Sequence, residues 1–142
     1  MNIAINGFGR IGRHAFKIAH AKGLNIVAIN DLTDTKTLAH LLKYDTAYPD
    51  FASDVSYEEK VILVDGKAIP AFAEKDPAQL PWKKLKVDIV LECTGFFRDK
   101  EKASLHLTAG AKKVVISAPS KGEGIKGFVR GVNCESYAGE DI

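Results

Sequence analysis

The stretch Asn6-Gly-Phe-Gly-Arg-Ile-Gly-Arg13 follows a short apolar run and leads into residues 10–21, where apolar positions recur at helical spacing. Gly7, Gly9 and Gly12 give it the pattern G-x-G-x-x-G. Between a strand and a helix, the first glycine permits a tight turn, the second lets a pyrophosphate approach the backbone, and the third lets the helix pack against the strand. Free N–H groups and the helix dipole favour an anion there. The stretch therefore predicts a dinucleotide-binding turn.

An acidic residue after the second expected strand supports this prediction. Asp31 follows the apolar run 26–29 and lies 19 residues after Gly12, close to the spacing of about 20 found in dinucleotide-binding domains. A carboxylate there can accept hydrogen bonds from the ribose hydroxyls and would repel a 2′-phosphate. No arginine follows it closely, so we expect NAD rather than NADP. The alternative is that Asp31 only caps the turn at residues 33–36.

Short β-branched runs alternate with helical stretches along the rest of the chain. This pattern is typical of a parallel sheet covered on both faces, and right-handed crossovers make such a sheet doubly wound. We therefore expect an α/β fold with a Rossmann-type, mostly parallel sheet and an inserted antiparallel β-hairpin. The expected strands are residues 3–5, 26–29, 87–93 and 114–116, with 128–129 as a last candidate; the hairpin is residues 61–69 with its turn at Asp65-Gly66, and the helices are residues 10–21, one capped by Asp34 or Thr35, and one from Asp99 to Ala109.

Composition limits the remaining possibilities. The 142 residues suit one domain, residues 1–142, and a net charge of +2 gives no reason to expect nucleic acid or a membrane surface as partner. The N-terminus lacks the pattern of a signal peptide, and two cysteines are too few for a disulfide framework. We therefore expect a cytoplasmic chain. The four histidines, which we interpret as forming neither a metal site nor a catalytic triad, are His14, His20, His40 and His106.

An ordered set of short motifs identifies a family. The chain resembles, over essentially all its residues, the N-terminal NAD-binding part of the phosphorylating glyceraldehyde-3-phosphate dehydrogenases of bacterial type. The motifs that carry the resemblance are Asn6–Arg13, Ile29-Asn-Asp31, Leu41-Leu-Lys-Tyr-Asp45, Asp76-Pro77 with Trp82, Glu92-Cys-Thr-Gly95, Gly110-Ala-Lys-Lys-Val114, Ile116-Ser-Ala-Pro119 and Gly131-Val-Asn133.

The resemblance implies specific contacts with NAD. Lys75 stands where the family usually has arginine, near the adenine. Because lysine lacks the planar guanidinium, we expect a backbone contact there rather than stacking. On their own, Thr94-Gly95 could form an ordinary turn and Phe97 could belong to the core. The implied contacts are the backbone of Arg10 and Ile11 for the pyrophosphate, Asp31 for the ribose, Lys75 for the adenine, Thr94, Gly95 and Phe97 beside the adenosine, and Ser117 near the nicotinamide.

The resemblance also implies an activity that this chain cannot perform alone. Members of the family oxidise glyceraldehyde 3-phosphate with NAD and phosphate to 1,3-bisphosphoglycerate, and a cysteine in an S-C-T-T-N motif is the nucleophile. No S-C-T-T-N occurs here. Cys93 is interpreted as a small buried thiol and Cys134 as a loop residue, so we name no catalytic residue. We expect a fragment that can bind NAD, lacks the catalytic domain, is inactive and either self-associates or is marginally stable, whereas the full-length protein is a homotetramer.

Two alternatives stay open, and one departure is visible. Erythrose-4-phosphate dehydrogenase is a close relative, although it tends to have glutamate where this chain has Asp31 and Ser-His-Pro where this chain has Ser117-Ala-Pro119. A stand-alone, non-catalytic NAD-binding module is the second alternative. The departure is Asp45-Thr-Ala-Tyr-Pro-Asp50, where many members carry a Ser-x-His-Gly-like stretch, and there we expect a local loop difference.

Overall fold

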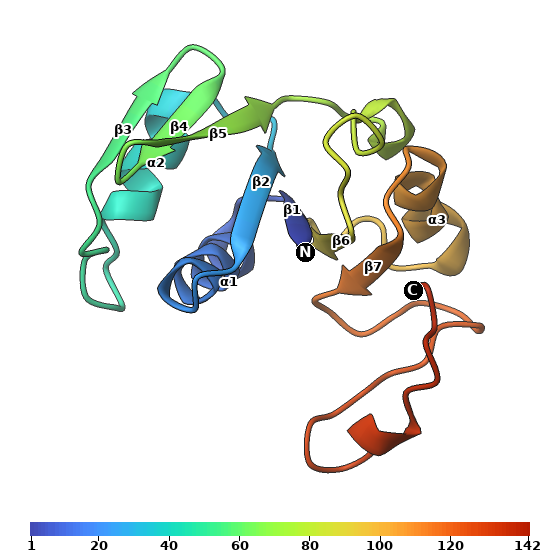
Figure 1. The fold of residues 1–142 in the computed structure, drawn as a ribbon. Helices are drawn as coiled ribbons and strands as arrows, with labels where there is room; N and C mark the ends of the chain where they lie inside the picture. The colour runs from blue at the N-terminus through green and yellow to red at the C-terminus, as the bar shows by residue number, and fades with distance from the viewer.

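The computed structural model describes all residues, Met1–Ile142, and contains one sheet of seven strands in the order β3-β4-β5-β2-β1-β6-β7 (Figure 1). Neighbouring strands from β5 to β7 are parallel, while β4 is antiparallel to both β3 and β5. The predicted Rossmann-type α/β class is confirmed. The strands are β1 (Asn2–Asn6), β2 (Asn25–Asn30), β3 (Val55–Glu58), β4 (Val61–Val64), β5 (Lys67–Phe72), β6 (Ile89–Glu92) and β7 (Lys113–Ile116).

The helices are α1 (Arg10–Ala21), α2 (Thr35–Lys43) and α3 (Lys100–Thr108). Helices α1 and α3 connect the parallel pairs β1–β2 and β6–β7, whereas α2 leads from β2 into the antiparallel insertion. Aspartate side chains cap two of them: Asp34 accepts from Thr37 N at 2.9 Å and Asp99 accepts from Lys102 N at 2.9 Å. Of the two candidate caps for α2, the structure therefore selects Asp34, because a carboxylate at this position satisfies an N–H group of the first turn. Two short 3-10 helices, Pro77–Gln79 and Cys134–Ser136, complete the set.

The strand alternation divides the core into two clusters. Ile3 and Ile5 of β1 belong to a large cluster with α1, α2 and β4, which also contains Phe16 and Leu42. Ala4, between them, belongs to a smaller cluster around Trp82 near α3. Because successive strand side chains point to opposite faces, β1 contributes to both clusters, and the parallel sheet is buried on both faces as the apolar runs predicted.

The antiparallel insertion is larger than the predicted hairpin. Its turn is confirmed, since Asp65 and Gly66 both have positive φ, 49° and 77°. The structure adds β3, whose mostly exposed sequence V-S-Y-E carries too few apolar residues to signal a strand. It also extends β5 through Pro70, which pairs with β4, to Ala71 and Phe72, which pair with β2. A proline at this crossing removes a donor where the strand changes partners.

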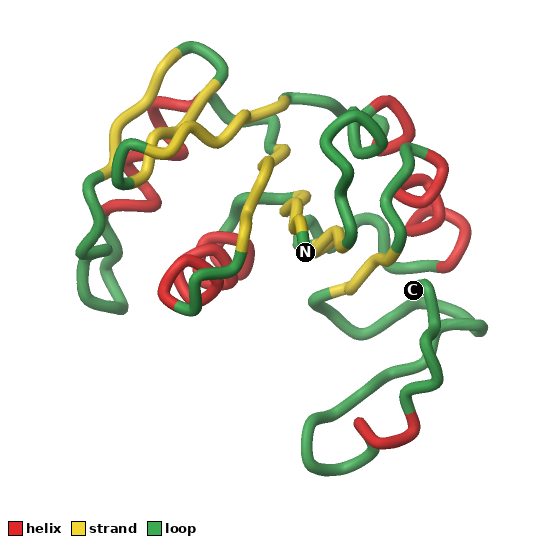
Figure 2. The backbone as a smooth tube through the Cα atoms, viewed as in Figure 1, coloured by secondary structure: helices red, strands yellow, loops and turns green.

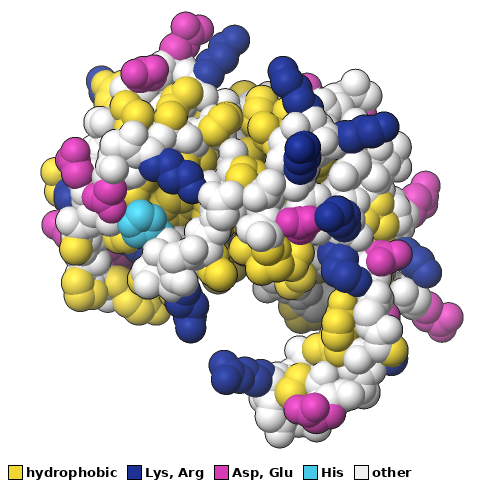
Figure 3. Space-filling model, in the orientation of Figure 1, with side chains coloured by type: hydrophobic (Ala, Val, Ile, Leu, Met, Phe, Trp, Pro, Cys, Tyr) yellow, Lys and Arg dark blue, Asp and Glu magenta, His cyan; other side chains and the backbone are white.

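The C-terminal segment, residues 117–142, projects away from the sheet and consists mostly of loops (Figures 1 and 2). The predicted strand at residues 128–129 is wrong: Phe128 instead packs edge-on against Tyr137 at 5.5 Å between ring centroids, in a stretch interrupted by glycines. The segment returns to the sheet where Val114 N donates to Asp141 O at 2.7 Å. Basic and acidic side chains are interspersed over the visible face (Figure 3). None of the helices has the length and hydropathy needed to cross a membrane.

Candidate dinucleotide-binding site

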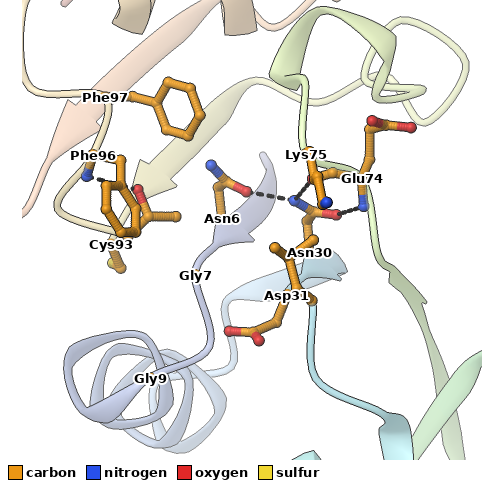
Figure 4. A pocket seen from close by; sticks show the side chains of 12 residues that line it. Asn6, Gly7, Gly9, Asn30, Asp31, Glu74, Lys75, Cys93, Phe96 and Phe97 are labelled. Carbon is orange, nitrogen blue, oxygen red and sulfur yellow. Dashed lines mark hydrogen bonds between the residues drawn. The ribbon is translucent and has the colours of Figure 1, made fainter.

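A cleft of about 460 Å³, called here the cofactor cleft, opens at the carboxyl ends of β1, β2 and β6 (Figure 4). From β1 the chain first builds one side of the sheet, with β2, and then the other, with β6. Open α/β sheets bind ligands outside the strand ends at such a reversal. The residues that line the cleft are Asn6, Gly7, Gly9, Asn30, Asp31, Leu32, Glu74, Lys75, Cys93, Thr94, Phe96 and Phe97.

The three glycines of the first turn face three different environments. A Cβ on Gly7, whose φ is +87°, would lie 2.6 Å from Thr94 N, and a Cβ on Gly12 would lie 2.1 Å from Gly7 O. Gly7 thus allows the turn beside β6, and Gly12 allows α1 to approach it. A Cβ on Gly9 would meet no heavy atom within 4 Å, so the space in front of Gly9 is open.

The start of α1 fits an anionic group. Gly9 is its N-cap residue, no side chain caps it, and its first turn contains no acidic residue. The first N–H groups of an α-helix have no partner within the helix, and here they follow the open position at Gly9 with no side chain to cap them. An uncapped helix start with its positive dipole end attracts a diphosphate, which is the fit that the predicted NAD-binding turn requires.

Asp31 lines the same cleft and is tied to the glycine turn. Its Oδ2 accepts from Phe8 N at 2.7 Å and its Oδ1 from Thr33 N at 3.0 Å. It does not cap α2, because Asp34 has that role. In Figure 4 the Asp31 carboxylate points toward Gly9. A negative charge held there can accept from hydroxyl groups and disfavours a second phosphate nearby.

The opposite wall comes from the loop after β5 and the turn after β6. Asn30 holds the first of these, since its Oδ1 accepts from Glu74 N and its Nδ2 donates to Glu74 O, both at 2.9 Å. Lys75 follows at the rim. Phe96 is 79% exposed, and Phe97 packs edge-on against His106 at 6.2 Å between centroids. Two aromatic rings therefore stand at the mouth of a cleft whose floor is polar.

The structure brings together only part of the predicted contact set. Six predicted residues line the cofactor cleft, and four others adjoin it along the backbone. Ser117 does not line the cleft: it follows β7, lines a separate groove there, and adjoins the cleft only through Cys93. The six are Gly7, Gly9, Asp31, Lys75, Thr94 and Phe97, the four are Arg10, Ile11, Gly12 and Gly95, and the lining residues not predicted are Asn6, Asn30, Leu32, Glu74, Cys93 and Phe96. Two of these could have been found from the sequence, because Asn6 and Asn30 are polar residues that end apolar strands.

Cys93 lies in the cleft wall and is only partly buried, whereas we expected it to be buried. Burial raises the pKa of its thiol above the ordinary value; a hydrogen bond with Ser117 opposes this rise and the nearby Glu92 adds to it. The thiol is therefore protonated and weakly nucleophilic at neutral pH. Both cysteines are free, and His, Cys, Asp and Glu side chains form no group of three or more that could hold a metal ion.

The strand order, the glycine turn and the acid at the end of β2 together define a Rossmann-type dinucleotide-binding domain. The chain belongs to the family described as glyceraldehyde 3-phosphate dehydrogenase, NAD binding domain, whose model matches residues 1–100. NAD is thus the cofactor of this domain.

Curated glyceraldehyde-3-phosphate dehydrogenases are similar to most of the chain. The protein of Thermotoga maritima is 60% identical over 126 residues, which is 87% of this chain and 38% of that protein. Those of Clostridium pasteurianum and Clostridium acetobutylicum are 54% and 55% identical over 140 residues, which is 98% of this chain and 42% of each protein. The chain therefore spans about two fifths of the length of these relatives.

Proposed function

We propose that residues 1–142 form the cofactor-binding domain of a phosphorylating glyceraldehyde-3-phosphate dehydrogenase and hold NAD in the cofactor cleft. The observation that carries this proposal is the uncapped start of α1 behind the open space at Gly9. In this proposal the backbone from Gly7 to Gly12 binds the diphosphate, Asp31 binds the adenosine ribose, and Lys75 lies beside the adenine. The remaining proposed contacts are Thr94, Gly95 and Phe97 near the adenosine, and Ser117 toward the nicotinamide.

The whole protein, we propose, oxidises glyceraldehyde 3-phosphate with NAD and phosphate to 1,3-bisphosphoglycerate. The names of the relatives support this activity over the erythrose-4-phosphate alternative. Bound NAD would supply the acceptor for a hydride. The domain would bind and orient the cofactor, and the nucleophile would come from a catalytic domain beyond these residues. We further propose a cytoplasmic homotetramer; the two free thiols suit a reducing compartment.

A substitution at Gly9 tests the diphosphate site without disturbing the fold. In Gly9→Ala the new methyl would enter the open space, and Gly9 has an ordinary φ of −70°. We expect at least a tenfold weaker Kd for NAD by calorimetric titration and an unchanged Tm. The matched control is Gly127→Ala, where a Cβ also meets nothing within 4 Å, and it should leave both values unchanged. Equal NAD affinity in the Gly9→Ala variant would refute the proposed site.

A further inference from the structure

Glu92 is a carboxylate buried beneath the cofactor cleft, and its residue is 1% exposed. Its Oε1 accepts from Thr94 N at 2.7 Å and also from Thr94 Oγ1. Its Oε2 accepts from Asn6 Nδ2 at 2.6 Å and contacts His106 Nε2 at 3.0 Å. One side chain that does not line the cleft therefore holds two residues that do, Asn6 from β1 and Thr94 from the turn after β6.

The imidazole of His106 completes this arrangement from α3. The ring is fully buried, and its Nδ1 lies 3.0 Å from Trp82 Nε1. An indole N–H can only donate, so Nδ1 accepts and the proton of the neutral ring is on Nε2. His106 Nε2 then donates to Glu92. In the sequence His106 has no partner nearby, and the fold of α3 places it against two buried partners, Trp82 and Glu92.

The hydrogen bonds continue across the sheet to the other wall of the cleft. Asn30 Nδ2 donates to Asn6 Oδ1 at 2.7 Å, and Asn30 also pairs through both amide atoms with the backbone of Glu74. Figure 4 shows the hydrogen bonds that link Asn6, Asn30 and Glu74 as dashed lines across the cleft. These hydrogen bonds, called here the polar relay, thus join the turn at Thr94 to the loop that carries Lys75. In order, the residues of the relay are Trp82, His106, Glu92, Asn6, Asn30 and Glu74.

A buried carboxylate without a positively charged partner is unfavourable unless hydrogen bonds compensate for its desolvation. Four donors do so here, and three of them, one on Asn6 and two on Thr94, belong to residues of the cleft wall. Packing alone would be served as well by apolar side chains of similar volume. The position of the relay, directly under the cleft and attached to both walls, points instead to a role in setting the distance between them.

We propose that Glu92 and His106 are positioning residues for NAD: through the polar relay they fix the two walls of the cofactor cleft at the separation that the adenosine half of the ligand requires. This inference rests on the proposed function. Neither residue touches the ligand, and their effect passes through Asn6 and Thr94 on one side and through Asn30 and Glu74 on the other.

The test uses NAD titrations of the 142-residue chain, followed by calorimetry and by the indole N–H resonance in ¹⁵N spectra. Trp82 is the only tryptophan, so the resonance needs no assignment. Trp82 is fully buried and lies outside the cleft lining. We nevertheless expect its resonance to shift on saturation with NAD, because contacts of the ligand with the cleft walls change the hydrogen bonds of the relay. A purely structural hydrogen bond would leave the resonance unmoved.

The variant Glu92→Gln replaces one acceptor oxygen by a donor. Because each oxygen of Glu92 accepts from two of the four donors, two donors around residue 92 lose their acceptor. We expect at least a tenfold weaker Kd for NAD and a smaller indole shift. Glu101→Gln, the same change at an exposed position of α3, should match the wild type. If Glu92→Gln does not fold, the indole shift of the wild type still tests the positioning role.

Each outcome separates the inference from the proposed function. Wild-type NAD binding with an unmoved indole resonance, or a folded Glu92→Gln variant with unchanged affinity, would overturn the positioning role alone. A wild-type chain that binds no NAD would overturn the proposed function and the positioning role with it.

Discussion

Two hollows border the parallel part of the sheet, and they differ in the elements and hydrogen bonds that support their walls. The cofactor cleft has a volume of about 460 Å³, while the groove between β7 and residues 117–142, called here the β7 groove, has about 640 Å³. The smaller hollow has three strand ends, an uncapped helix start and a buried hydrogen-bonded floor. The larger one is lined mainly by aliphatic side chains and by a segment with little secondary structure.

The difference shows that volume alone does not make a binding site. Specific ligand sites combine an apolar wall with a few convergent polar groups held by a rigid scaffold. The β7 groove is closed mainly by lysine contacts to backbone oxygens, such as Lys113 Nζ to Gly139 O at 2.8 Å, and Val115 and Val129 remain half exposed.

Truncating one aromatic residue of the main core and one beside the β7 groove should give the largest contrast. Phe16 on α1 is 1% exposed and packs edge-on against Phe8 in the main core, so Phe16→Ala should lower the free energy of unfolding by about 3–5 kcal/mol. Phe128 beside the β7 groove is half-buried, and Phe128→Ala should lower it by only about 1 kcal/mol. Urea denaturation measures both values. Equal losses would mean that residues 117–142 belong to the cooperative core.

A substitution at the third glycine should come next in size. In Gly12→Ala the Cβ would lie 2.1 Å from the backbone oxygen of Gly7, and neither backbone can move without displacing α1 from β1. We expect a loss of about 3 kcal/mol or more in the free energy of unfolding. Gly9→Ala is the matched control within the same motif, because its Cβ meets open space. Similar Tm values for the two variants would contradict the close approach of α1.

Cofactor choice should respond to Asp31 by a smaller amount. Asp31→Asn removes the charge that disfavours a 2′-phosphate, so the ratio of Kd values for NADP and NAD should fall about tenfold, equivalent to about 1.4 kcal/mol. Asp34→Asn is the control: it makes the same charge change three residues later, and asparagine also caps helices. Calorimetric titration with both dinucleotides measures the ratio. A wild-type chain that binds NAD and NADP equally would remove the proposed role of Asp31.

Local rules made much of the cofactor cleft predictable from sequence. The glycine spacing, the acid after β2 and the aspartate caps depend on neighbours within one turn or one strand–helix unit. The turn at Asp65-Gly66 was predictable for the same reason, because both residues tolerate positive φ. In each case the signal lies in residues that are close in the chain, and the structure repeats it without change.

The polar relay was not predictable, because its partners meet only in the folded chain. Glu92 and His106 are 14 residues apart, on β6 and α3, and Trp82 comes from the loop before β6. A lone histidine on a helix carries no sign of its partners. The path of β5 through Pro70 and the absence of a strand at residues 128–129 likewise depend on which strand each segment meets, and local composition does not contain that information.

The smallest predicted effect is a pH response confined to the C-terminal segment. Glu140 accepts from Lys126 Nζ and from Ala138 N, each at 2.9 Å. The hydrogen bond from Lys126, followed by backbone hydrogen bonds, lowers the pKa of Glu140 to about 2. Because this pKa is depressed in the folded chain, the contacts contribute fully above about pH 4.5, the ordinary value for glutamate, and are lost as the pH falls toward 2.

The amide resonance of Ala138 measures this response. We expect its titration midpoint near pH 2 in the wild type and a higher midpoint, toward the ordinary value, in Lys126→Ala. Glu123→Gln on the same segment is the control, since Glu123 takes part in none of these contacts, and it should leave the midpoint unchanged. Both partners are accessible to solvent, so 0.5 M salt should raise the midpoint as well. At about 0.1 M ionic strength charges are already screened beyond roughly 10 Å. A wild-type midpoint near 4.5 would show that Lys126 does not hold the segment. The loss of these contacts should leave the cofactor cleft unaffected, because its buried floor contains neither Lys126 nor Glu140.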